Sequence, residues 1–327
     1  MPRFKNTLIL SVIFIILAII VLIIENPFKE SKKKGGSEDL LFTGINSDEV
    51  SRIEITKGTE NTILEKRDGG WIISSLNDFH ADKRYIDNMI KKIKDMKKEN
   101  MASNNPEKRA TFQVDKENGI EIKIYGNEGK TLAHFFVGKV SPDIGSTYIR
   151  KEGANDVVSV SGYLGSIFYK GDSKNWRKRN IFDFKDEDVV SILLTSPESN
   201  IVLRRGEMGE DKGYKWNIIE PESTPAKGDT VKGIISTLSS LNTVDFPELR
   251  DLKEYGLDNP KAKVTVTLED NSVHTLFIGN EEKEKKERYV KYEKEDYIYT
   301  IYNHTYNNIF KGLDDLREEK KEETSMP

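Results

Sequence analysis

The strongest constraint on this 327-residue chain is that it carries one pattern twice, at a spacing of about 140 residues. VSRIEIT at 50–56 recurs as VVSILLT at 189–195, an offset of 139, and Trp71 recurs as Trp216, an offset of 145. A repeat of this length can bury a hydrophobic core of its own. The sequence therefore predicts two copies of one module rather than a single large domain.

Each copy contains a hydrophobic stripe with helical spacing. The two stripes are Ile86, Met89, Ile90, Ile93 and Met96, and Val231, Ile234, Ile235, Leu238 and Leu241. Spacings of three and four residues place these side chains on one face of an α-helix. We therefore expect one main amphipathic helix in each module.

Segments with alternating hydrophobic residues follow each helix. Ile120, Ile122 and Ile124 are aligned with Val264, Val266 and Leu268, and the segments HFFVG and TLFIG end at Gly138 and Gly279. A period of two is typical of half-buried strands. Later in each copy, Tyr148 matches Tyr289. The predicted class is α+β, with a mainly antiparallel sheet, the main helix and a short C-terminal helix in each module.

A hydrophobic segment precedes the repeats. Leu8 to Ile24 consists of Leu, Ile, Val and Phe except for Ser11 and Ala18. As a helix, its 17 residues span about 25 Å, enough for a bilayer core. A cleaved signal peptide is the alternative, but residues 25–29 (ENPFK) lack a small-x-small cleavage site. We predict an N-terminal transmembrane helix, a signal anchor that places the chain in the membrane.

These features predict an order of parts along the chain. We expect a cytoplasmic tail over residues 1–7, a transmembrane helix over 8–24, a linker over 25–47, a first module over 48–185, a second over 186–317 and a charged tail over 318–327. Because only seven residues precede the span, we expect the modules to lie outside the cytoplasmic membrane. Lys29 and the lysines at 32–34 also permit the reverse orientation, with a cytoplasmic body.

The order of these segments resembles the domain-of-unknown-function family 4340 of bacterial envelope proteins, in two tandem copies. That pattern combines an anchor, a V-x-x-I-x-I strand, a Gly-x-Trp strand, a helical stripe, a Tyr-Gly-Leu-Asp-x-Pro turn, a strand ending in Gly and a closing Leu/Trp-Arg segment. The second copy carries the turn as YGLDNP at 255–260, whereas the first copy has FQVDKE at 112–117. The resemblance implies an auxiliary, non-ATPase component near ABC-type export systems of the gliding-motility kind.

Motifs for chemistry are few. The chain has no cysteine, which excludes thiol chemistry and thiolate metal sites. The four histidines are His80, His134, His274 and His304, and none forms an H-x-x-x-H pair. GKT at 129–131 lacks the upstream glycine of a phosphate-binding loop and is interpreted as a turn. We predict no catalytic, cofactor-binding or metal-binding residues, no cofactor, and a protein that is not an enzyme.

Three features of the sequence are candidate binding elements. Lysines at 91, 92, 94, 97 and 98, with WRKR at 176–179, form either a basic face or a solvated one. Trp71 and Trp216 are either sugar platforms or core anchors, and their recurrence favours core anchors. Residues 281–288 (EEKEKKER) are interpreted as an exposed hairpin loop of mixed charge.

The net charge of −4, with acid in slight excess, argues against a nucleic-acid partner. The expected function is a membrane-anchored extracytoplasmic binding or scaffolding protein of the cytoplasmic (inner) membrane. Its expected partners are the membrane, through Leu8 to Ile24, and an ABC-type permease or other envelope proteins. The alternative is an envelope polysaccharide-binding protein or hydrolase with a site between the modules.

Overall fold

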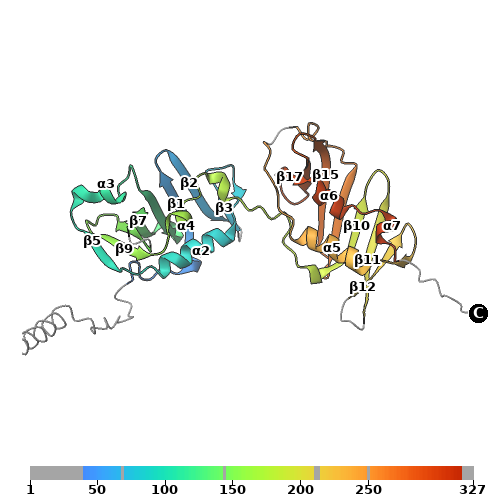
Figure 1. Cartoon of the computed structure of the whole chain (residues 1–327), viewed down its shortest axis with the longest axis horizontal. Coiled ribbons are helices and arrows are strands. Elements are labelled where there is room, and N and C mark those ends of the chain that lie inside the picture. Colours follow the sequence, from blue (N-terminus) through green and yellow to red (C-terminus); the bar gives the residue numbers. More distant parts are fainter. Residues whose placement is uncertain (1–39, 68–69, 143–144, 210–213, 249–250, 319–327) are drawn as a thin grey trace, which may run out of the picture. The chain divides into compact units, whose positions relative to one another are not determined.

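The computed structural model describes residues 40–67, 70–142, 145–209, 214–248 and 251–318. Two antiparallel sheets, each accompanied by a few helices, form a two-domain arrangement (Figure 1). Grouping by contacts places the described residues up to Lys66 and Arg84–Asp172 in one unit, and Arg67–Lys83 with the residues from Ser173 in the other. The hydrogen-bonded strands within Arg67–Lys83 nevertheless continue the first sheet, so each module is defined by its sheet.

The first sheet contains nine strands among the described residues, in the order β4-β3-β2-β1-β6-β7-β8-β9-β5. They are β1 (Val50–Lys57), β2 (Glu60–Arg67), β3 (Gly70–Ile73), β4 (Phe79–His80), β5 (Asn100–Ser103), β6 (Ile120–Gly126), β7 (Thr131–Val140), β8 (Ser146–Lys151) and β9 (Val157–Ser161). The helices of this module are α2 (Lys83–Lys94), α3 (Arg109–Phe112) and α4 (Gly165–Phe168).

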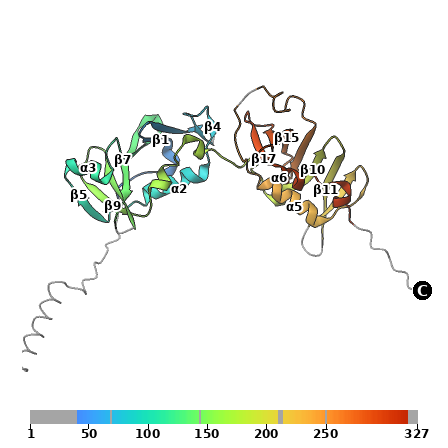
Figure 2. The ribbon, with the colours of Figure 1, turned by 45° about the horizontal axis from the view of Figure 1, so that its top comes forward.

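The second sheet contains eight described strands in the order β13-β12-β11-β10-β14-β15-β16-β17. They are β10 (Val189–Thr195), β11 (Asn200–Met208), β12 (Tyr214–Glu220), β13 (Thr224–Pro225), β14 (Ala262–Leu268), β15 (Val273–Glu282), β16 (Glu287–Tyr292) and β17 (Tyr299–Tyr302). The helices are α5 (Gly228–Ser239), α6 (Asn303–Ile309) and α7 (Leu313–Leu316). Figure 2 shows α5 and α6 against the strands of this module.

The two sheets repeat the same local hydrogen bonds. The amide of Ala81 donates to the carbonyl of Trp71 at 2.8 Å, and the amide of Ala226 donates to the carbonyl of Trp216 at 2.9 Å. Both tryptophan side chains are buried, which confirms that they are core anchors. The main amphipathic helix is also present in each copy, as α2 and α5.

One part of the predicted repeat alignment is wrong by two residues. Ile53 pairs with Ile124 in the first sheet, and Ile192 pairs with Val266 in the second. Ile124 therefore corresponds to Val266, and not to Leu268 as predicted. A slip of two residues keeps every side chain on the same face of the strand, so the alternation of hydrophobic residues could not detect it.

Each module has its own buried core. In the first module, Ile53, Ile86, Met89, Phe135 and Trp176 are at most 1% exposed. In the second, the most deeply buried side chains include Ile192, Leu203, Ile234, Leu238 and Val290. The helical stripes supply one layer of each core and the alternating strands supply the other.

The first module includes residues that the sequence placed in the linker. Leu41 and Phe42 are buried, and the amide of Leu41 donates to the carbonyl of Met96 at 2.9 Å. The ring of Phe42 lies 4.9 Å from that of Phe135. The packed structure therefore begins before residue 48, because these apolar side chains cover the sheet.

The second module likewise includes residues that precede residue 186. Ile181 and Phe182 are buried within its core, and the amide of Ile181 donates to the carbonyl of Leu241 at 2.9 Å. The charged run at 186–188 marked the boundary in the sequence, but the burial of apolar residues begins earlier.

Among the described residues, no helix is long and apolar enough to cross a membrane, and the predicted span Leu8 to Ile24 lies outside them.

A close backbone approach fixes the same turn in both modules. The carbonyl oxygen of Tyr255 occupies the space that a Cβ on Gly279 would need, and the carbonyl oxygen of Phe112 does the same at Gly138. The turn residue after each aromatic has positive φ, +66° at Gly256 and +56° at Gln113. The first copy therefore adopts the turn although its sequence, FQVDKE, departs from the pattern.

This close approach predicts a large effect for the Gly279→Ala substitution. The added methyl group would overlap the carbonyl of Tyr255, so the free energy of unfolding should fall by about 1–3 kcal/mol. Urea denaturation of the full chain measures the loss. The control is Gly233→Ala in α5, where the methyl meets open space and should stabilise the helix by about 0.5–1 kcal/mol. Equal effects of the two substitutions would refute the packing argument.

Candidate functional site

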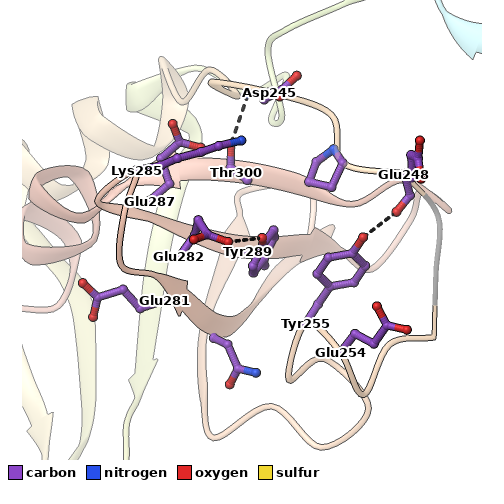
Figure 3. Close-up of a pocket in the computed structure, with 12 residues that line it drawn as sticks. Asp245, Glu248, Glu254, Tyr255, Glu281, Glu282, Lys285, Glu287, Tyr289 and Thr300 are labelled. Carbon is purple, nitrogen blue, oxygen red and sulfur yellow. Dashed lines mark hydrogen bonds between the residues drawn. The ribbon is translucent and has the colours of Figure 1, made fainter.

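The candidate site is a pocket of about 430 Å³ in the second module. It lies between the segment that leads into the 255–260 turn and the β15–β16 hairpin (Figure 3). Of the described residues that line it, six carry carboxylates and one is a lysine: Asp245, Glu248, Glu254, Glu281, Glu282, Glu287 and Lys285. The site therefore has a strongly acidic lining.

The turn forms one wall of the pocket. The hydroxyl of Tyr255 donates to the carbonyl of Glu248 at 2.7 Å, and the amide of Asn280 donates to the carbonyl of Tyr255 at 2.7 Å. The ring of Tyr255 lies 4.6 Å from that of Tyr289 on β16. These contacts hold two aromatic rings together at the base of the acidic lining.

The β15–β16 hairpin forms the opposite wall and carries two glutamates in direct opposition. Glu282 and Glu287 are cross-strand partners, as are Glu281 and Arg288. Because side chains alternate between faces along a strand, Glu282 and Glu287 share the pocket face with Tyr289. Arg288 belongs to the other face, where its guanidinium lies 4.3 Å from the ring centre of Tyr306.

The two glutamates differ in how their oxygens are satisfied. Glu282 Oε2 accepts a hydrogen bond from the hydroxyl of Tyr289 at 2.8 Å (Figure 3). Glu287 is only 7% exposed, and its buried Oε2 has no hydrogen-bond partner within the described part of the chain. A buried charged oxygen without a partner is costly. Glu287 is therefore the least satisfied group of the pocket.

The equivalent hairpin positions in the first module carry serines in place of the two glutamates. Gly138 and Tyr148 align with Gly279 and Tyr289, which places Ser141 opposite Glu282 and Ser146 opposite Glu287 in the alignment of the two copies. The hydroxyl of Ser146 is satisfied, since it donates to Glu99 Oε2 at 2.8 Å.

The frame of the site, which consists of the close turn and the aromatic pair, is nevertheless the same in the first copy. The rings of Phe112 and Tyr148 lie 4.7 Å apart, as the Tyr255–Tyr289 pair does at 4.6 Å. The frame of the site therefore forms in the first copy without the two glutamates.

The environment of Tyr289 favours the neutral phenol. Burial raises its pKa to about 12, and the hydrogen bond to Glu282 adds to the shift because a phenolate beside that carboxylate would be repelled. Tyr289 therefore stays a hydrogen-bond donor to Glu282 across the physiological range.

The sequence interpretation of residues 281–288 as an exposed loop is wrong for Glu287. The segment contains the ends of two paired strands, and Glu287 is buried. The signal that could have revealed this is the alignment of Gly279 and Tyr289 with their first-copy equivalents, which places Glu287 inside a strand.

The other residues weighed from the sequence do not gather at this pocket. His134 Nε2 lies 2.7 Å from Glu121 Oε1, and His274 Nδ1 lies 2.6 Å from the hydroxyl of Tyr292. In the parts of the chain that the structure describes, no three His, Cys, Asp or Glu residues are grouped so as to hold a metal ion. Gly129 lies in the tight connection between β6 and β7, as the turn interpretation predicted.

Three of the basic residues of the first copy contact other parts of the chain. Lys92 Nζ donates to the carbonyl of Ser161 at 2.9 Å, and Lys94 Nζ donates to Ser47 Oγ at 3.2 Å. Arg177 is buried, with its guanidinium 4.2 Å from the ring centre of Phe79. Lys92, Lys94 and Arg177 are therefore engaged by the chain itself.

The comparisons with known proteins agree with the repeated architecture. The family model "Domain of unknown function (DUF4340)" matches residues 71–215 and again residues 216–322. The chain therefore belongs to this family and contains two tandem copies of its domain, as the resemblance predicted. No curated protein and no solved structure matches the chain.

The raised pKa of Tyr289 predicts a specific alkaline titration. The phenolate absorbance of the full chain and of Tyr289→Phe is titrated with base. The difference between the two curves is the ionisation of Tyr289, and its midpoint should lie near pH 12. Because the folded pKa lies above the ordinary value of about 10, the stability from this shift is complete below pH 10 and is lost as the pH rises through 12. Glu282→Gln should lower this midpoint. A midpoint of this difference curve at pH 10 would contradict the assigned burial of Tyr289.

Proposed function

We propose that the protein is a membrane-anchored, extracytoplasmic binding or scaffolding protein and a non-ATPase auxiliary component of an ABC-type transport system. The hydrophobic segment Leu8 to Ile24 supports the anchor. Family membership supports the auxiliary role through the association stated for similar proteins.

The observation that carries the binding role is the difference between two copies of one frame. The second copy has a pocket with two opposed glutamates where the first has two serines. The frame folds with either set, since the aromatic pair and the close turn recur in both. Side chains that the fold does not require, placed around a pocket, are the expected signature of ligand recognition.

The alternative is an envelope polysaccharide-binding protein or hydrolase. Opposed carboxylates are the groups that glycoside hydrolysis uses. In this pocket, however, Glu282 accepts a hydrogen bond from Tyr289, so one of the two carboxylates is engaged by the fold. A binding role accounts for both glutamates without assigning either one a chemical step, and we propose that the protein is not an enzyme.

Topology is tested with reporters fused after Glu318. An alkaline phosphatase fusion should be active, because this enzyme needs an oxidising compartment for its disulfides. A β-galactosidase fusion at the same position is the matched control and should be inactive. The opposite pair of results would place the modules in the cytoplasm and refute the extracytoplasmic proposal.

The transport role is tested by affinity purification of the full chain from detergent at its native expression level. Permease subunits of an ABC-type system should be recovered with the tagged chain and should be absent from an untagged strain. Repeated recovery of the chain alone would contradict the auxiliary role.

A further inference from the structure

We propose that the pocket of the second module binds a ligand with a primary alkylammonium group, and that a linear polyamine is the form it takes best. The Glu282–Glu287 pair is the element that receives the ammonium group. The inference rests on the proposed binding role only in treating this pocket as the binding site. It does not depend on membrane orientation or on a permease partner, so its test is separate from theirs.

The first argument is electrostatic. Glu282 and Glu287 are direct cross-strand partners on one face, and like charges in this relation destabilise a sheet. A cation between them would remove the repulsion. Arg288, the cation next in sequence to Glu287, pairs with Glu281 at 3.4 Å. The hairpin therefore presents two carboxylates to the pocket while this arginine is engaged elsewhere.

The second argument is the unsatisfied oxygen. Glu287 lines the pocket and is only 7% exposed. Its Oε2 has no hydrogen-bond partner among the described residues. An ammonium group supplies three N–H donors in a compact volume, so one group can serve more than one carboxylate oxygen. Charge-assisted hydrogen bonds of this kind are shorter and stronger than neutral ones.

The third argument distinguishes an organic cation from a metal ion. In the described segments, no three potential ligands are grouped to hold a metal ion. The cavity of about 430 Å³ lies in the range of small-molecule sites and far exceeds the size of a bare ion. Tyr255 and Tyr289 line it with aromatic surface, which attracts ammonium groups and covers methylene chains.

The distribution of acids favours more than one ammonium group. Asp245 lines the pocket from the segment before the turn, whereas Glu282 and Glu287 line it from the hairpin. A flexible chain with two or more ammonium groups can meet both walls at once. Lys285, which also lines the pocket, is the built-in cation that such a ligand would have to approach.

The experiment is isothermal titration calorimetry of the detergent-purified full chain with spermidine at low ionic strength. The wild-type chain should bind, and Glu287→Gln should weaken the affinity by at least about tenfold, since it removes the charge and keeps the size. Glu282→Gln should weaken it as well. Lys285→Gln should strengthen binding, because it removes a competing positive charge.

Two controls separate the pocket from general charge. Glu198→Gln changes an exposed acid in the β10–β11 turn of the same module and should leave the affinity unchanged. Glu287→Ser installs the residue that the first copy carries at Ser146, and should abolish binding. Without spermidine, Glu287→Ser and Glu287→Gln should melt no lower than the wild type, because the buried carboxylate they remove has an unpaired oxygen. A large drop in melting temperature would assign Glu287 a structural role and overturn the proposal.

Further titrants identify the source of the ammonium group. Nα-acetyl-lysine N-methylamide keeps the side-chain ammonium group of lysine. It should bind more weakly than spermidine if free polyamines are the ligand, and equally well if the ligand is a lysine side chain of a partner. Both results require an effect of Glu287→Gln. The proposal is overturned if spermidine does not bind the wild-type chain, or if Glu287→Gln leaves the affinity for spermidine unchanged. It is also overturned if Glu198→Gln weakens the affinity as much as Glu287→Gln does, or if calcium binds through Glu287 and no amine does.

Discussion

The structure depends on one close backbone contact, in which the carbonyl of an aromatic turn residue occupies the space of a missing Cβ. Gly279 and Tyr255 make this contact in the second module, and Gly138 and Phe112 make it in the first. The contact brings the turn onto the end of a strand and positions an aromatic ring against the next strand. Because glycine alone leaves that space free, the contact ties the turn, the sheet and the pocket wall to one residue type.

Only the second copy places a pair of like charges at this position of the hairpin. The second copy carries opposed glutamates where the first has serines, and the frame is the same in both. A like-charge pair with a buried, unpaired oxygen lowers stability by general electrostatics. Its position in a pocket gives that cost a physical meaning, because a bound cation would remove it. The two modules thus share the turn and the aromatic pair but differ in the electrostatics of one hairpin.

The sequence predicted the parts of this account that follow from periodicity. The repeat, the two helical stripes and the buried Trp71 and Trp216 all depend on local hydrophobic patterns, and the structure confirms them. The predicted alignment of the strands after each main helix was wrong by two residues. A shift of two residues leaves the alternation of hydrophobic and polar positions unchanged, so the sequence pattern could not reveal it. Glu287 was missed because EEKEKKER has the composition of a solvated loop, and burial there depends on strand pairing that composition does not encode.

The most direct test is amide chemical-shift mapping of the isotope-labelled full chain in micelles, with spermidine added. The account predicts shifts confined to the second copy, at the 245–256 segment and the β15–β16 hairpin. It predicts no shifts at Ser141, Ser146 or the 112–117 turn, where the same frame lacks the glutamates. Equal shifts in both copies, or shifts spread over acidic surfaces outside the pocket, would contradict the claim that the second copy alone carries a binding site.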